Sequence, residues 1–311
     1  MPLEPSLRRT LSKVFSKPAH FQSLTFAEIL KWGKKELAFL GDRQAAFEAE
    51  CLLEVISGCS RAALYLETNR EISAKDLNQF QEWIQNRKTR MPLAYILRQT
   101  YFWNESLEVG QGCLIPRPET EILIERFIKV SGFSKEKFFQ FVDLGCGSGA
   151  IGIALLRYFE NAQATFLDIS EEALQITSKN LGRYDLLDRS EILCSDLFET
   201  PRNASKENPK KWDAIVSNPP YLSKQDWKNA EPEILFEPRQ ALDGGEDGFV
   251  FYERILREAP EFLNPCGWLA VEVGQGQAAR VAGEMKQRFF KEIKIFRDHS
   301  NIERIVLGRT N

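Results

Sequence analysis

Histidine and paired cysteines are scarce in this chain of 311 residues, which contains only two histidines, His20 and His299. The six cysteines stand alone and none belongs to a C-x-x-C pair; they are Cys51, Cys59, Cys113, Cys146, Cys194 and Cys266. A structural zinc site needs clustered cysteine and histidine ligands, so we expect no metal centre. Scattered cysteines are typical of reduced thiols inside the cell rather than of a disulfide framework.

Long apolar runs and an excess of positive charge are also missing. Residues 1–21 lack the apolar core of a secretory signal, and no run approaches the ~20 apolar residues of a membrane span. Lys and Arg number 41 against 44 Asp and Glu, for a net charge of −3. Nucleic-acid-binding domains usually carry a basic field. We therefore expect a soluble cytoplasmic protein without a direct nucleic-acid or membrane partner.

The N-terminal third of the sequence has the pattern of a small helical domain. After an irregular arm over residues 1–22, apolar residues recur at helical spacing, with capping residues such as Thr25 and Ser73 before them. Residues 1–92 are predicted to form a helical bundle that packs or docks a partner. Residues 93–117 turn aromatic and β-like, with glycines at possible turns, and are predicted to be a linking β-hairpin.

From residue 118 onward, strand-like and helical segments alternate. Alternation of this kind predicts an α/β domain with a doubly wound, mostly parallel sheet over residues 118–311. The last two strands are predicted to pair antiparallel. The predicted strands are 139–144, 164–167, 191–194, 214–216, 268–273, 293–296 and 302–307.

The strand over residues 214–216 ends at Asn218-Pro219-Pro220-Tyr221. Prolines cannot donate to a sheet ladder, so the strand stops there and leaves a rigid corner at its carboxyl end. In open α/β sheets ligands bind at these ends. The Asn218 side-chain oxygen and the Pro219 carbonyl oxygen are acceptors that could hold both hydrogens of an NH2 group, with Tyr221 over its flat face. Alternatively, residues 218–221 form an ordinary turn without a binding role.

A glycine-rich loop follows the first strand of the predicted sheet. Glycines let the backbone turn tightly and approach a ligand at a helix N-terminus, and Asp168 stands where an acidic residue would accept from ribose hydroxyls. These features fit a nicotinamide cofactor as well as S-adenosylmethionine. The loop residues are Gly145, Cys146, Gly147, Ser148 and Gly149.

Two features favour S-adenosylmethionine. The full D-x-G-x-G-x-G pattern beginning at Asp143 resembles the methionine-binding loop of class I methyltransferases, and an NH2-holding corner has no role in hydride transfer. Asp196 could accept from the adenine amino group, with Leu197 or Phe198 against the ring. A strand-terminating Asp followed by a core Phe is an equally good interpretation of that segment.

The chain as a whole resembles the HemK/PrmC family of release-factor glutamine methyltransferases. The glycine loop and the Asn-Pro-Pro-Tyr corner are shared with N6-adenine DNA methyltransferases, so other segments discriminate. These are I-P-R-P-E-T-E at residues 115–121, F-E-P-R-Q-A-L at residues 236–242 and R-I-V-L-G-R at residues 304–309.

The resemblance implies a class I, Rossmann-like methyltransferase domain preceded by the helical bundle and the hairpin. It implies transfer of a methyl group from S-adenosylmethionine, leaving S-adenosylhomocysteine, to the side-chain N5 of the glutamine in the Gly-Gly-Gln motif of class 1 release factors. The glycine loop, Asp168, Asp196, Leu197 and Asn218 would then line the cofactor site, with Phe102 of the hairpin touching the cofactor. Residues 218–221 would hold the glutamine.

Two other readings of the sequence stay open. An N6-adenine methyltransferase would use the same corner on a flipped base, but it would need a basic groove and a target-recognition domain. A catalytically idle docking scaffold would have lost cofactor binding. We expect a monomer that acts on release factors during translation termination.

Overall fold

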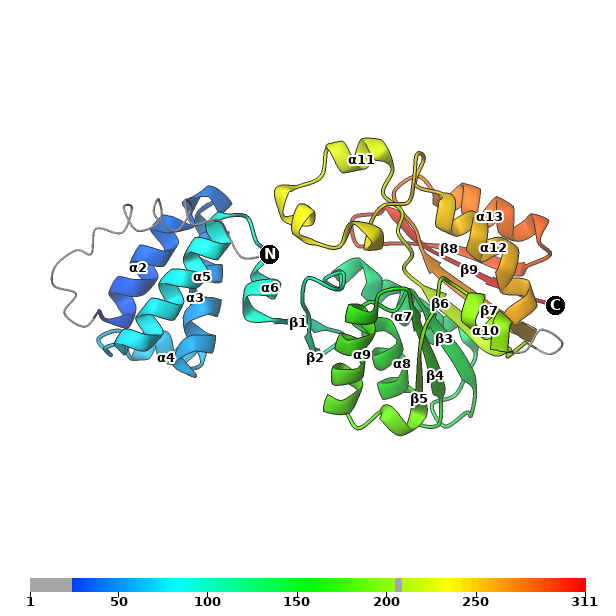
Figure 1. Cartoon of the computed structure of the whole chain (residues 1–311), viewed down its shortest axis with the longest axis horizontal. Coiled ribbons are helices and arrows are strands. Elements are labelled where there is room, and N and C mark those ends of the chain that lie inside the picture. The colour runs from blue at the N-terminus through cyan, green and yellow to red at the C-terminus, as the bar shows by residue number, and fades with distance from the viewer. Residues whose placement is uncertain (1–23, 205–208) are drawn as a thin grey trace. The chain divides into compact units, whose positions relative to one another are not determined.

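The computed structural model describes residues 24–204 and 209–311 (Figure 1). The irregular arm expected over residues 1–22 lies outside the described residues. The chain divides into two compact units, Met1–Leu93 and Ala94–Asn311. Within the described residues, no helix is both long enough and apolar enough to cross a membrane.

The first unit contains the expected helical bundle. The Thr25 side chain accepts from the Glu28 N–H and the Glu28 carboxylate accepts in return, so the predicted capping box starts α2. Gly58, in the left-handed region at φ 66°, follows the last residue of α3. Ser60 and Ser73 cap the next two helices. The helices of this unit are α2 (Phe26–Glu36), α3 (Asp42–Ser57), α4 (Arg61–Leu66) and α5 (Ala74–Lys88).

The stretch expected to be a β-hairpin is only partly one. Strands β1 (Gln99–Phe102) and β2 (Glu105–Glu108) pair antiparallel as predicted, but Leu93–Leu97 forms the short helix α6. Pro92 precedes this helix, where a missing N–H costs nothing, and Arg98 ends it at φ 55°. Tyr95, which lies in the stretch predicted to be β-like, is therefore helical.

The second unit is built on a sheet of seven strands in the order β5-β4-β3-β6-β7-β9-β8. Strands β5, β4, β3, β6 and β7 run parallel, and β9 pairs antiparallel with both β7 and β8. The predicted parallel sheet and its antiparallel closing pair are confirmed. The strands are β3 (Gln140–Leu144), β4 (Gln163–Asp168), β5 (Ser190–Cys194), β6 (Trp212–Ser217), β7 (Leu263–Glu272), β8 (Lys291–Arg297) and β9 (Glu303–Arg309).

Helices cover both faces of this sheet (Figure 1). Successive strand residues point to opposite faces, so Phe141 joins the apolar core that contains α7, α8 and α9, whereas Val142 joins the core that contains α12 and α13. The sequence pattern predicted these long helices but not the short helices α10 (Glu199–Ala204) and α11 (Lys224–Lys228). The long helices are α7 (Pro118–Ser131), α8 (Ala150–Tyr158), α9 (Glu171–Arg183), α12 (Val250–Phe262) and α13 (Ala278–Gln287).

The register between β3 and β6 brings two distant segments together. Leu144 pairs with Ser217, and the Ser217 hydroxyl donates to the Leu144 carbonyl at 2.7 Å. Both strands end there, so the glycine loop and the proline corner leave the sheet side by side at its carboxyl edge. This is the edge at which open α/β sheets bind ligands.

Candidate active site

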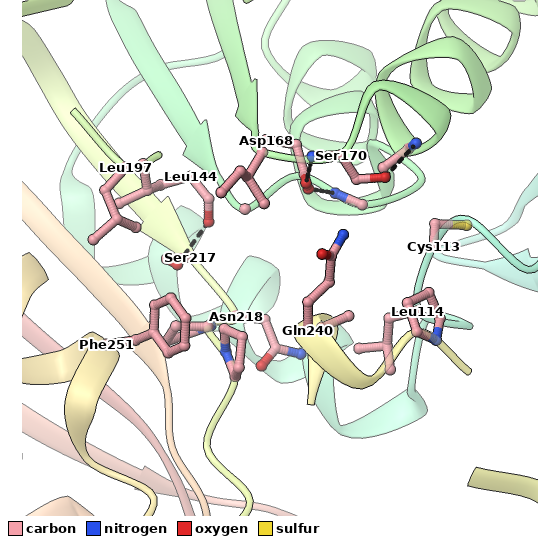
Figure 2. A pocket seen from close by; sticks show the side chains of 18 of the residues that line it. Cys113, Leu114, Leu144, Asp168, Ser170, Leu197, Ser217, Asn218, Gln240 and Phe251 are labelled. Atoms are coloured by element: carbon pink, nitrogen blue, oxygen red, sulfur yellow. Dashed lines mark hydrogen bonds between the residues drawn. The ribbon is translucent and has the colours of Figure 1, made fainter. Parts of the chain in front are cut away.

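A cavity of about 220 Å³ lies at this carboxyl edge, within the second unit (Figure 2). In the view of Figure 2, Asp168 and Asn218 lie on opposite sides of it and the Gln240 side chain points into the space between them. Its walls come from the segment after the hairpin, the ends of β3 to β6, the segment around residue 240 and helix α12. The residues that line the cavity include Leu144, Gly145, Gly147, Asp168, Asp196, Leu197, Asn218, Pro219, Pro220, Phe251 and Arg254.

The glycine loop is held in an open turn by backbone hydrogen bonds. The N–H groups of Gly145 and Cys146 both donate to the Leu167 carbonyl of β4, at 2.8 and 3.0 Å. Gly145, Gly147 and Gly149 all have positive φ, at 71°, 58° and 79°, a region that residues with a Cβ rarely adopt. The alternation of glycines in the sequence therefore reflects a backbone requirement at each of these three positions.

Helix α9 fixes the outer side of the same loop. The Thr177 hydroxyl donates to the Gly147 carbonyl at 2.9 Å, and the Asn180 amide donates to the Ser148 carbonyl at 2.9 Å. Thr177 and Asn180 are fully buried. The carbonyl groups that the turn exposes are thus satisfied from behind, which leaves the front of the loop for a ligand.

Only part of the predicted loop faces the cavity. Gly145 and Gly147 line it, whereas Cys146, Ser148 and Gly149 do not. Cys146 is 7% exposed and belongs to the apolar core, with its sulfur 3.6 Å from the Thr177 hydroxyl. Burial raises the pKa of the Cys146 thiol well above its ordinary value. The thiol is therefore a neutral packing group.

Asp168 ends β4 and is placed by two backbone donors. One carboxylate oxygen accepts from the Gly147 N–H at 2.8 Å and the other accepts from the Ser170 N–H at 2.9 Å. Burial raises the pKa of Asp168, and these N–H groups oppose that rise. Each carboxylate oxygen can accept a second hydrogen bond, so Asp168 retains capacity for two ligand hydroxyls.

Behind the loop, Asp143 is 1% exposed. One of its oxygens accepts from the Gly152 N–H at 2.8 Å, and the other has no hydrogen-bond partner among the described residues. Burial raises the pKa of Asp143 to about 8. Burial therefore favours the neutral form of this carboxyl group, which supports the start of α8.

Gly152 is expected to tolerate no larger side chain. A Cβ there would lie 2.3 Å from a ring carbon of Phe166 and 3.0 Å from Asp143 Oδ2. Gly152→Ala should lower the free energy of unfolding by about 1–3 kcal/mol through overpacking, measured by urea denaturation. Gly283→Ala is the matched control, because a Cβ at that helical position meets nothing within 4 Å. Equal stability of the two variants would contradict the prediction.

The third wall of the cavity is formed by the segment after β5 and by helix α12. The Asp196 carboxylate pairs with the Arg254 guanidinium at 2.8 Å, and both residues line the cavity together with Leu197 and Phe251. Phe198, the alternative aromatic wall, is fully buried and stacks on Phe262 with ring centroids 4.6 Å apart. Phe198 therefore packs in the core, and Leu197 and Phe251 contribute apolar surface on this side of the cavity.

The Asn218 side chain is oriented from behind by buried groups. Its Nδ2 donates to the Thr120 hydroxyl at 3.2 Å, and that hydroxyl donates to Glu272 Oε2 at 2.5 Å. The other Asn218 side-chain atom, the carbonyl oxygen, is left available for a ligand. Among the described residues no hydrogen bond is donated to the Pro219 carbonyl oxygen. The two acceptors that the sequence pattern indicated are both available at the corner.

Tyr221 lies on the other side of this corner. Its hydroxyl donates to Glu272 Oε1 at a long 3.4 Å, and burial raises the pKa of Tyr221 above its ordinary range. Tyr221 lines a smaller cavity, which it shares with Asn218, Pro219 and Arg117. The corner therefore separates the main cavity from a second recess.

Phe102, expected to reach a cofactor from the hairpin, is 2% exposed and packs in the core. It is absent from the lining of the main cavity. Its hairpin is held against α9 of the same unit, where the Asn180 amide group bonds both the N–H and the carbonyl of Glu108. A contact between Phe102 and a cofactor stays a prediction.

Several residues at the site were not singled out from the sequence as functional. Thr120 and Glu237 belong to segments that the family resemblance used, but nothing in the pattern showed their partners. Glu237 is buried, accepts from the Ile115 N–H at 2.9 Å and pairs with Arg117. Glu272 ends an ordinary apolar strand, so only its burial beside Thr120 reveals it.

Two relatives of the chain are described as release factor glutamine methyltransferases. A release factor glutamine methyltransferase of Geobacter sulfurreducens is 34% identical over 286 residues, which covers 92% of this chain and 96% of the relative. One from Caulobacter vibrioides is 33% identical over 290 residues, covering 93% of this chain and 98% of the relative. Similarity at this level extends over both units.

Two family models match most of the chain, and a solved structure shares its fold. A model of the PrmC N-terminal domain matches residues 28–97, and a model of the methyltransferase small domain matches residues 119–256. The catalytic domain of hMettl16 in complex with MAT2A 3′UTR hairpin 1 superposes with a TM-score of 0.53 at 13% identity, covering 77% of this chain and 83% of that one. That similarity concerns the fold. The chain belongs to the family of release factor glutamine methyltransferases, which are class I S-adenosylmethionine-dependent enzymes.

Proposed function

We propose that the cavity binds S-adenosylmethionine and that the proline corner presents a glutamine carboxamide of a release factor to its methyl group. The observation that carries this proposal is the orientation of Asn218. Its Nδ2 is already engaged by Thr120, so its side-chain oxygen is the atom left to accept from a substrate NH2 group beside the cavity.

The cofactor is proposed to lie along the carboxyl edge of β3, β4 and β5. Its methionine part lies against Gly145 and Gly147, with the ribose hydroxyls at Asp168. The adenine lies between Leu197 and Phe251, with its amino group toward Asp196. Cys146, Ser148 and Gly149 contribute by shaping the loop, which agrees with the hydrogen bonds that fix it from α9.

The methyl transfer needs no strong base. The amide nitrogen of the glutamine attacks the methyl carbon, the carbon–sulfur bond breaks, and the electron pair of that bond returns to sulfur. Positive charge moves from sulfur to nitrogen, and a proton then leaves the nitrogen. Acceptors at Asn218 and Pro219 stabilise this charge and orient the nitrogen. Pro220 keeps the corner rigid, and Tyr221 borders the carboxamide.

The relatives are named as release factor glutamine methyltransferases, and the substrate of this chain is proposed to be the glutamine of the Gly-Gly-Gln motif in class 1 release factors. We assign release-factor docking to residues 1–92, linkage to residues 93–117 and catalysis to residues 118–311. We further propose that the enzyme acts as a monomer in the cytoplasm, where translation terminates, without direct contact to nucleic acid.

Mass spectrometry tests the reaction directly. The protein is incubated with S-adenosylmethionine and a purified class 1 release factor, and the tryptic peptide that contains Gly-Gly-Gln should gain the mass of one methylene group on the glutamine. A release factor with that glutamine changed to alanine is the control. Methylation of duplex DNA instead of the release factor would overturn the proposal.

A further inference from the structure

A chain of buried hydrogen bonds reaches from the core of the second unit to the Asn218 amide. Glu272, at the end of β7, is 1% exposed, and Thr120, in the first turn of α7, is 3% exposed. The Thr120 hydroxyl lies 2.5 Å from Glu272 Oε2 and 3.2 Å from Asn218 Nδ2. Neither Thr120 nor Glu272 lines the main cavity. Their connection to the site runs through Asn218.

The charge of Glu272 decides the direction of this chain. An ionised carboxylate can only accept, so the Thr120 hydroxyl must donate to it. The Thr120 oxygen can then only accept from Asn218, so Asn218 must donate to it with its NH2 group. The Asn218 carbonyl oxygen is thereby turned away from Thr120 and toward a substrate.

Protonation of Glu272 would reverse the direction of these hydrogen bonds. The carboxyl group can then donate to Thr120, and the Thr120 hydroxyl becomes free to donate to the Asn218 carbonyl oxygen. In that arrangement Asn218 turns its NH2 group toward the site. Two NH2 groups cannot accept from each other, so a substrate carboxamide would lose one of its two acceptors.

We propose that Glu272 and Thr120 are positioning residues that hold the Asn218 amide with its oxygen toward the substrate nitrogen. This inference rests on the proposed function and extends it to two residues outside the cavity. Tyr221 belongs to the same arrangement because its hydroxyl donates to the second oxygen of Glu272. One buried carboxylate thus orients two side chains of the corner.

The surroundings of Glu272 allow its charge to change near neutral pH. The titratable groups that face it are Glu119 on α7, Tyr221 at the corner, Tyr252 on α12 and Arg304 on β9. Burial raises the pKa of Glu272 to about 7, while the Thr120 hydroxyl and Arg304 oppose that rise.

Activity and stability should therefore respond to pH in opposite directions. Turnover requires the ionised form and should increase as the pH rises through about 7. A carboxyl with a raised pKa in the folded state binds its proton more tightly there than in the unfolded chain. The contribution of Glu272 to stability is consequently full below its ordinary pKa of 4.5 and is lost as the pH rises through about 7.

Variants of Thr120 and Glu272 test the proposal in the full-length enzyme. Thr120→Val removes the hydroxyl at nearly constant volume and should lower kcat about tenfold, the effect of one lost hydrogen bond at the substrate. Thr120→Ser keeps the hydroxyl and should restore most of the turnover. Glu272→Gln should abolish the increase of kcat with pH, because an amide does not titrate in this range.

Thr165→Val is the matched control, because Thr165 is also buried and its hydroxyl also bonds a carboxylate, that of Glu191, but it lies away from the main cavity. The dissociation constant for S-adenosylmethionine, measured by calorimetry, should stay within about twofold in all variants, because Thr120 and Glu272 do not line the cofactor cavity. A parallel loss of cofactor affinity, or turnover of Thr120→Val equal to that of the control, would overturn the proposal.

A measurement without substrate separates this proposal from the proposed function. The Asn218 side-chain amide signals in ¹H–¹⁵N spectra should shift with a midpoint near pH 7 in the wild type and show no such step in Glu272→Gln. A wild type that fails to methylate release factors rejects the proposed function alone. Amide signals that do not respond to pH reject the positioning role.

Discussion

Asn218→Ala is expected to reduce kcat for release-factor methylation by about 10²–10³-fold, the loss seen when one preorganised charge-stabilising group is removed from an active site. The Asn218 oxygen accepts from the attacking nitrogen, and its interaction strengthens as positive charge develops there. The effect should therefore appear in kcat more than in the affinity for the cofactor. Single-turnover kinetics with saturating S-adenosylmethionine measure it.

Asn161→Ala is a suitable control for this variant, because Asn161 is exposed and its side-chain NH2 group donates to the Glu136 carbonyl, away from the cavity. Its turnover should equal that of the wild type. Asn218 is held by Thr120 at the end of β6 and has no part in the apolar core, so Asn218→Ala should fold normally. Turnover of Asn218→Ala within tenfold of the wild type would reject the assigned role of Asn218.

Asp168→Asn should weaken S-adenosylmethionine binding by about 10²-fold or more. The carboxylate is expected to accept from the ribose hydroxyls, and a hydrogen bond to a charged acceptor contributes about 1.5–3 kcal/mol. An amide also cannot serve both backbone donors, because its NH2 group would face the N–H of either Gly147 or Ser170. Calorimetric titration with the cofactor measures the loss.

Asp188→Asn is the matched control for this second variant. Asp188 is exposed and borders a separate recess away from the main cavity, so its replacement should leave the dissociation constant unchanged. If Asp168→Asn bound S-adenosylmethionine as tightly as the wild type, the cofactor would have to lie elsewhere in the cavity. The proposed path along β3, β4 and β5 would then be wrong.

Local patterns in the sequence were sufficient for most elements of the fold. The capping box at Thr25, the alternation of strands and helices after residue 118 and the proline stop after β6 all depend on neighbouring residues, so they can be read without the tertiary structure. The predicted hairpin over residues 93–117 was wrong at Leu93–Leu97, because aromatic residue types favour strands while the preceding Pro92 permits a short helical turn. The position of Phe198 could not be predicted from its residue type, since an aromatic side chain suits both the apolar core and the wall of a ligand site.

The sequence by itself therefore determined the family, the parallel sheet and the two motifs that a methyl transfer requires. Only the tertiary structure decided how those motifs cooperate. Pairing of Leu144 with Ser217 sets the glycine loop beside the proline corner, and burial of Glu272 against Thr120 sets the orientation of the Asn218 amide. Strand register and the loss of water around a carboxyl group arise from contacts between residues far apart in the chain, which is why no local pattern contains them.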